Sequence, residues 1–219
     1  MSLRHARITT ALALLLVSLA SAASAATLWD QSAISFSPNA PAIQNGKFTG
    51  FGGGNFFSVN DVTVPAGGWT VTTITEYFSD WEGVDMQAKA PNGVLILMPK
   101  TGAMPVGAPS TSTTVPLTWT DTVQSGQGVY VMVASGLNLV LAPGDYWITV
   151  SPICPIDNFF GNNAQWPALT TLGASVATYD TAWNSYYAGF DGAFKIEGFE
   201  GAATPTRNSS WGSLKALYR

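Results

Sequence analysis

Side chains suited to binding a polar ligand gather between positions 157 and 166. This stretch holds one acid, three asparagines and one tryptophan, which are Asp157, Asn158, Asn162, Asn163 and Trp166. Aspartate and asparagine can hydrogen-bond to sugar hydroxyls, and the flat face of an indole can stack on a pyranose ring. The stretch therefore indicates a carbohydrate-binding surface, which Trp183, Tyr186 and Tyr187 would extend. The alternative is structural, because asparagine and glycine also serve turns and aromatic residues fill cores.

A second possibility is a calcium site in the acidic stretch that follows Phe78. Asp80, Glu82 and Asp85 place three carboxylates within six residues, and Ca²⁺ is bound by six or more oxygen ligands. The spacing matches no EF-hand loop, and acids at the end of a strand are commonly only solvated. We therefore expect no cofactor, with calcium as the one candidate.

The sequence offers little for nucleophilic catalysis. His5 is the only histidine and Cys154 the only cysteine. If the first residues are removed as a leader, no Ser-His-Asp, Cys-His or histidine metal site remains, and one cysteine cannot form a disulfide within the chain. A carboxylate pair of the glycosidase kind could be drawn only from Glu76, Glu82, Glu197 and Glu200. Nothing distinguishes an acid from a nucleophile among them, so we predict a non-enzymatic protein.

The first twenty-five residues are typical of an export signal. Arg4 and Arg7 precede a low-charge run from Ala11 to Ala22, and Ala23-Ser24-Ala25 forms a small-x-small cleavage site. Without the two arginines, seven basic residues face 13 acidic ones, a net charge of −6. A sparse acidic surface argues against nucleic acid or anionic lipid as a partner. We expect a secreted or cell-envelope location, with no membrane span in the mature chain.

The chain from 59 to 78 predicts two strands joined by a tight corner. Val62 and Val64 alternate with polar neighbours, which is the period of a strand, and the corner spans 65–68 (Pro-Ala-Gly-Gly). The buried parity changes between Val71 and Ile74, so we predict a β-bulge near 72–73. The alternative is that the strand ends at position 72 and another begins.

Similar patterns recur along the rest of the chain. Further strands are predicted at 27–31, 84–90, 94–98, 115–123, 129–134, 137–141, 146–150 and 193–199, with 84–90 and 94–98 as a hairpin. Short strands with frequent turns predict one all-β domain at 26–200, an antiparallel β-sandwich of jelly-roll or Ig-like type. Residues 201–208 are predicted to be a linker and 209–219 a short amphipathic helical tail, which either packs on the sandwich or serves as a recognition tag. Cys154 is predicted to be a small buried hydrophobe, with pairing between chains as the alternative.

Three motifs resemble bacterial exported β-sandwich proteins of the PEP-CTERM-associated type. They are Asp61–Pro65 with Gly68–Val71, Leu141–Trp147 and Gly192–Gly198. The resemblance covers about Leu28 to Gly198 and implies an extracellular or envelope role, with no established catalytic residues. The sorting tail of that type is absent, since the sequence ends with Trp211–Arg219 instead.

These observations favour an exported, non-enzymatic β-sandwich with a structural or adhesive role at the cell surface or in extracellular matrix. Its expected partner is an extracellular glycan or a matrix component, and its oligomeric state is left open. A carbohydrate-binding module is the first alternative. A secreted glycoside hydrolase is the second.

Overall fold

The computed structural model of the protein describes residues 24–49, 55–80, 84–154 and 164–201. The predicted leader up to residue 23 and the tail from residue 202 lie outside these ranges. So do five predicted site residues, Glu82, Asp157, Asn158, Asn162 and Asn163. Among the described residues, no helix has the length and apolar character needed to cross a membrane.

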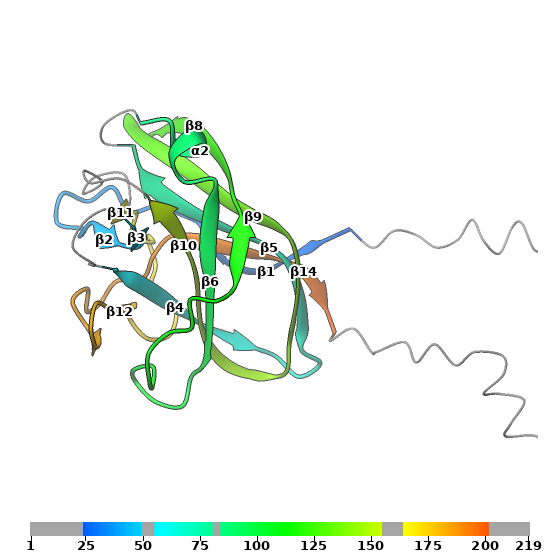
Figure 1. Ribbon diagram of the computed structural model, residues 1–219. Coiled ribbons are helices and arrows are strands. Elements are labelled where there is room, and N and C mark those ends of the chain that lie inside the picture. The colour runs from blue at the N-terminus through cyan, green and yellow to red at the C-terminus, as the bar shows by residue number, and fades with distance from the viewer. Residues whose placement is uncertain (1–23, 50–54, 81–83, 155–163, 202–219) are drawn as a thin grey trace, which may run out of the picture.

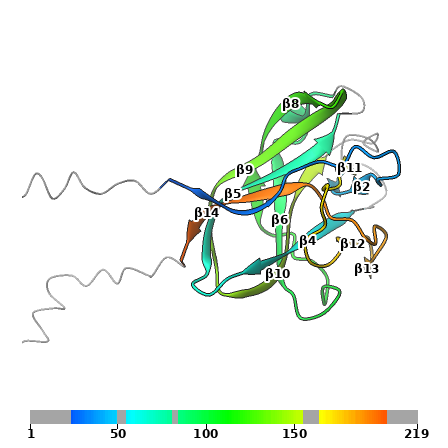
Figure 2. The same ribbon diagram turned by 180° about the vertical axis from the view of Figure 1, so that it is seen from behind.

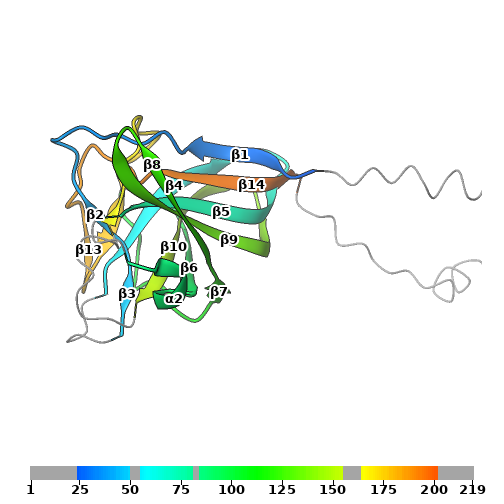
Figure 3. The same cartoon turned by 90° about the horizontal axis from the view of Figure 1, so that it is seen from above.

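The described chain forms two β-sheets that pack face to face, together with one short helix (Figure 1). Across the first sheet lie β1 (Ala26–Gln31), β14 (Phe194–Glu200), β5 (Trp69–Ser79), β9 (Gln127–Leu141) and β8 (Thr118–Gln124). Two short strands, β11 (Ala164–Gln165) and β2 (Ile43–Gln44), continue it from the end of β5. Figure 3 shows β1, β14, β5 and β9 side by side as one layer.

The second sheet pairs a central strand with neighbours from distant parts of the chain. Across it lie β13 (Trp183–Asn184), β12 (Ala177–Tyr179), β4 (Phe57–Val64), β10 (Gly144–Cys154), β6 (Asn92–Pro99) and β7 (Thr114–Pro116). These pairs are antiparallel, while β3 (Lys47–Phe48) runs parallel to the end of β10. The prediction of an all-β, antiparallel sandwich is therefore confirmed.

Aromatic side chains fill the space between the two sheets. Trp119 stands edge-on to Phe78 and to Tyr130, with ring centroids 5.6 and 6.2 Å apart. Cys154 belongs to the same core and is fully buried, and burial raises the pKa of its thiol to about 12. The prediction that Cys154 is a small buried hydrophobe is confirmed.

A second, smaller core covers the opposite face of the second sheet. Along β4, Val62 and Val64 belong to the main core, whereas Phe57 and Val59 join Trp147 in a separate cluster. Successive side chains of a strand point to opposite faces, so β4 is buried on both. This double burial explains why Phe57 and Val59, which face away from the main core, are apolar.

The two Pro/Gly corners of the sequence lie beside each other at one end of the sandwich. The corner at 65–68 links β4 in the second sheet to β5 in the first, and the corner at 142–143 links β9 back to β10. Trp69 pairs with Leu141 on one sheet, and Gly144 pairs with Val64 on the other. Both corners therefore pass the chain between sheets.

The predicted β-bulge is present in β5 at Thr72. Val71 pairs with Leu139 and with Gly198, and the pairing resumes at Thr73. The Thr72 hydroxyl donates to the Glu197 carbonyl oxygen across the bulge at 3.2 Å. The extra residue lets Val71 and Ile74 face the same core, which is what the change of parity required.

The predicted hairpin of 84–90 with 94–98 is wrong. Residues Met86–Lys89 form a short helix, α2, whose N-cap Asp85 accepts a hydrogen bond from the Ala88 amide at 3.0 Å. The alternation around Met86 fits one buried helical side chain as well as a strand, and a local cap decides for the helix. Strand β6 pairs instead with β10 and β7.

Two other boundaries differ from the prediction. The strand expected at 115–123 is divided at Leu117, where the chain passes from β7 in the second sheet to β8 in the first. The strands expected at 129–134 and 137–141 are one strand, β9, with an irregularity near Gly136, whose φ is 70°. Glycine adopts this positive φ without strain, so the strand continues.

Candidate functional site

Between β11 and β14 the chain leaves the sandwich and returns to it. Pro167 and Gly192 form an isolated β-bridge, and the Ala168 amide donates to the Asp191 carbonyl oxygen at 2.8 Å. Residues 169–190, which we name the surface excursion, are therefore closed at their base. The excursion carries β12 and β13 and adds them to the free edge of β4.

Several exposed apolar side chains lie on or beside this excursion. Six large hydrophobic side chains are exposed among the described residues, and three of them, Leu169, Leu172 and Tyr186, belong to the excursion. A fourth, Val106, is next to Gly107, whose carbonyl oxygen accepts a hydrogen bond from the Trp183 indole at 2.6 Å. Singly exposed apolar side chains are normal on a protein surface, but four of these six lie on or beside one segment of the chain.

The excursion lies at the end of the sandwich opposite the described chain ends. Strand β14 starts beside the excursion base and ends at Glu200, which pairs with Trp69 at the corners. Ala26 pairs with Gly198, so β1 also begins at the corner end. Figure 2 shows β12 and β13 on the side away from the outer end of β14. The seven residues of β14 span roughly 20 Å.

The described residues of the predicted carbohydrate surface fall in two places. Trp183 and Tyr186 are both on the excursion, where Trp183 stands edge-on to Tyr179 with centroids 5.2 Å apart. Trp166 lies at the base and packs edge-on against Phe36 at 5.1 Å. Trp166 and Trp183 are both half-buried and both pack against another ring, and Trp183 also packs on the second, smaller core, whereas Tyr186 is exposed.

A half-buried aspartate, Asp180, holds the tip of the excursion in shape. Asp180 accepts hydrogen bonds from the Tyr186 hydroxyl at 2.7 Å, from the Ala182 amide at 3.2 Å and from the Thr181 amide. The Asn184 side-chain amide donates to the same carboxylate at 3.3 Å. These donors, the Thr181 amide first, hold the pKa of Asp180 at about 2, so the side chain is ionised at neutral pH. The Tyr186 ring is therefore held in a defined orientation.

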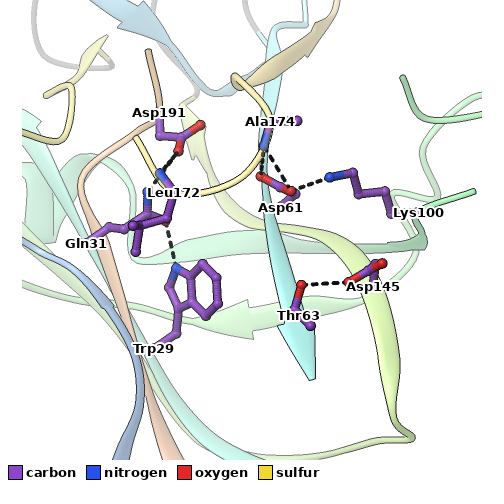
Figure 4. A network of polar contacts seen from close by, with 9 residues as sticks. All are labelled: Trp29, Gln31, Asp61, Thr63, Lys100, Asp145, Leu172, Ala174 and Asp191. Carbon is purple, nitrogen blue, oxygen red and sulfur yellow. Dashed lines mark hydrogen bonds and ion pairs between the residues drawn. The ribbon is translucent and has the colours of Figure 1, made fainter. Parts of the chain in front are cut away.

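Beneath the excursion, a buried carboxylate on β4 fastens the loop that leads to β12 (Figure 4). Asp61 accepts two hydrogen bonds from the Ala174 amide, at 3.1 and 3.2 Å, and forms an ion pair with Lys100. The Lys100 ammonium also lies 5.1 Å from the centroid of the Trp147 ring. Because Asp61 is buried on β4, the hydrogen bonds that it accepts from the Ala174 amide anchor the excursion to the second sheet.

A second buried carboxylate fastens the same loop from the first sheet (Figure 4). Asp191 accepts hydrogen bonds from the Gln31 side-chain amide at 2.8 Å and from the Leu172 amide at 3.0 Å. Trp29 donates its indole hydrogen to Gln31 at 2.7 Å and holds that amide in place. Burial, opposed by these hydrogen bonds, raises the pKa of Asp191 to about 6.

A third carboxylate, Glu76, lies fully buried where the second sheet splits. The pairing of β4 with β10 ends at Asn60 and Ile148, after which β4 pairs with β12. Glu76 accepts hydrogen bonds there from the Val150 amide at 2.8 Å, from the Thr149 hydroxyl at 3.0 Å and from Asn45 at 3.2 Å. The Glu76 carboxylate thus accepts from the Val150 amide in place of a neighbouring strand. Burial outweighs these neutral donors and raises its pKa to about 8.

Sequence reasoning did not identify the roles of these buried acids. Asp61 occupies a polar position in an alternating strand, which is typical of a solvent-facing residue. Asp191 and Lys100 belong to no recognisable sequence motif, and the sequence offers Glu76 only as a possible catalytic acid. The one signal available was glycine: Gly173, with φ of 86°, lies where any side chain would collide with the Asp61 carboxylate.

Two of the predicted calcium ligands, Asp80 and Asp85, lie near a third acid, Asp121, but the described residues form no metal site. Asp85 caps α2, and the pKa of Asp121 is raised, first by burial and then by the charges of Asp80 and Asp85. Glu82 lies outside the described residues. Within those residues, no group of three or more His, Cys, Asp or Glu side chains is arranged to hold a metal ion. Calcium binding stays a prediction.

Removing the Asp61 carboxylate is expected to loosen the excursion. In Asp61→Ala, the Ala174 amide and the Lys100 ammonium lose their partner, which should cost about 2–3 kcal/mol of unfolding free energy. Amide hydrogen exchange in residues 172–176 should accelerate. Asp145→Ala is the matched control, because the exposed Asp145 carboxylate accepts a hydrogen bond from Thr63, which lies on β4 as Asp61 does. This substitution should change stability by less than about 0.5 kcal/mol. Equal effects of the two variants would contradict the anchoring role.

No family model matches this chain, and neither curated proteins nor solved structures gave a match.

Proposed function

We propose that this protein is an exported, non-enzymatic β-sandwich that acts in adhesion at the cell surface or in extracellular matrix. The surface excursion, residues 169–190, is its binding face. The carrying observation is that exposed apolar and aromatic side chains lie on an excursion that buried carboxylates hold in place. A cleaved leader at 1–25 and a short helical tail at 209–219 belong to this proposal, as does a jelly-roll or Ig-like strand order.

The position of the excursion supports adhesion. The described chain ends leave from the corner end of the sandwich, and the excursion lies about one strand length away at the other end. A chain attached through either end would therefore present the excursion outward. This arrangement suits a surface protein that binds a partner.

Glu76 and Glu197, two of the possible catalytic acids, already have partners within the protein, which supports binding over hydrolysis. Glu76 is fully buried between hydrogen-bond donors, and Glu197 pairs with Lys195 at 2.9 Å on β14. A glycosidase needs two carboxyl groups that both reach the scissile bond. Glu76 cannot meet a substrate from its position in the core.

Adhesion predicts that removing apolar side chains from the excursion weakens binding. Leu169→Ser combined with Leu172→Ser should reduce binding of the labelled exported protein to cells and isolated matrix of the producing bacterium about tenfold, since truncated interface anchors commonly cost more than ~1 kcal/mol. Val123→Ser combined with Val140→Ser is the matched control, because these exposed valines lie on β8 and β9. Equal binding by both double variants, or no binding by the wild type, would overturn the proposal.

A further inference from the structure

We infer that the tip of the surface excursion, around Tyr186, binds a neutral glycan. This inference rests on the proposed function and names the ligand class for the same surface. Its basis is an exposed aromatic ring in a fixed orientation, bordered by hydroxyl and amide side chains. A sugar ring presents apolar C–H faces and a rim of hydroxyl groups, and the tip offers a counterpart for each.

The Tyr186 ring supplies the apolar counterpart. Tyr186 is 57% exposed, and its hydroxyl donates to the Asp180 carboxylate at 2.7 Å. Tyr187 supports it from the side, with centroids 6.5 Å apart and planes inclined by 74°. The Tyr187 hydroxyl accepts from the Gln44 amide at 3.1 Å. A ring already fixed in this way loses little conformational entropy when a flat partner stacks on it.

Polar side chains beside the ring supply the hydrogen-bonding counterpart. Thr181 and Ser185 are exposed, and hydroxyl groups both donate and accept. The Asn184 amide nitrogen donates to Asp180 and to the Ala182 carbonyl oxygen, the latter at 2.9 Å. This fixes the amide, and its oxygen accepts no hydrogen bond from the described residues.

Charge favours a neutral glycan over an anionic one. Asp180 is ionised at the tip, because its donors hold its pKa at about 2. The chain as a whole carries a formal net charge of −4. Uronate or sulfate groups would be repelled by this carboxylate, whereas neutral hydroxyl groups can donate to carboxylate oxygens.

The test compares substitutions of Tyr186 in binding to neutral and anionic polysaccharides. The exported full chain would be run in affinity electrophoresis through soluble glucan, mannan and galactan, with alginate as the anionic probe. We expect retardation in at least one neutral polysaccharide and none in alginate. Tyr186→Ala should weaken that binding about tenfold or more. Tyr186→Phe keeps the ring and its contact with Tyr187 but loses the hydrogen bond to Asp180, so it should weaken binding by only about threefold.

Tyr186→Leu separates sugar stacking from docking of an apolar protein surface. Leucine keeps apolar area but has no flat face, so it should bind as weakly as Tyr186→Ala. Val123→Ser is the control for loss of an exposed apolar side chain elsewhere, and thermal unfolding checks that each variant folds. Retained binding in Tyr186→Leu, or no retardation of the wild type by any neutral polysaccharide, overturns the inference.

The outcome for the glycan is distinguishable from the outcome for adhesion. If wild-type protein binds cells and matrix but none of the neutral polysaccharides, the adhesive function stands and the glycan inference fails. If it binds neither, both fail. If Leu169→Ser with Leu172→Ser weakens cell binding while Tyr186→Ala does not, the partner contacts the leucines, and the glycan inference also fails.

Discussion

Glu76→Gln is expected to flatten a fall in stability between pH 5 and pH 8 that we predict from the buried Glu76 carboxylate. Glutamine has the shape of a protonated glutamate and does not ionise. Its oxygen can still accept from the Val150 amide and the Thr149 hydroxyl. The variant therefore isolates the charge of one side chain from its packing.

The direction of this effect follows from the raised pKa of Glu76. Burial among neutral donors raises that pKa from 4.5 to about 8, so the folded protein holds a proton that the unfolded chain has already lost. The corresponding stabilisation is fully present below pH 4.5 and is lost as the pH rises toward 8. Between pH 5 and 8 the loss should amount to roughly 3–4 kcal/mol.

The measurement is the unfolding free energy of wild type and variant by denaturant titration at several pH values. The difference between the two proteins should shift by that amount in favour of Glu76→Gln as the pH rises, whatever their difference at pH 5. Asp191→Asn provides a comparison, because the Asp191 pKa of about 6 confines its shift mainly to lower pH. Parallel curves of unfolding free energy against pH for wild type and Glu76→Gln would show that the buried carboxylate is not the source of the pH dependence.

Gly198→Ala is expected to be among the most destabilising single substitutions in the sandwich. Gly198 pairs with Val71 beside the β-bulge, and a Cβ there would overlap the Thr70 backbone carbonyl oxygen. A backbone atom between two paired strands has little room to move. The strands would have to separate locally, which should cost about 3 kcal/mol or more.

Gly102→Ala is the matched control for this substitution. Residue 102 has no atom within 4 Å of an added Cβ, so only the backbone entropy changes and stability should vary by less than about 1 kcal/mol. Thermal and denaturant unfolding of the two variants would be compared with the wild type. Similar stability of Gly198→Ala and Gly102→Ala would mean that the bulge adjusts more easily than its geometry indicates.

Local patterns predicted the strands, the corners and the bulge because each depends on neighbouring residues. Proline and paired glycines at 65–68 impose a turn wherever they lie, and the parity change between Val71 and Ile74 requires an extra residue in any core-facing strand. The same local reasoning failed at Met86, where one apolar residue among polar neighbours suits a strand or a helix. The hydrogen bond by which Asp85 caps the N-terminus of the helix decided that choice.

The candidate site was only partly accessible to such reasoning. Trp183 and Tyr186 could be proposed because aromatic residues with nearby asparagine are suited to sugars. Whether an aromatic residue reaches the surface depends on what packs over it. Trp166 and Trp183 are half-buried against Phe36 and Tyr179, whereas Tyr186 is exposed. Asp180 had no distinguishing pattern, although it holds the Tyr186 hydroxyl.

The sequence by itself determined an all-β chain with Pro/Gly corners, a bulge and a sparse acidic surface, because these follow from residue types and short-range periodicity. Only the tertiary structure decided which acids are buried and what they hold. Asp61 anchors Ala174 across 113 positions, and Glu76 completes a split sheet through Val150, 74 positions away. Burial of a charge is a property of the packed fold, since it depends on every element that excludes water from that point.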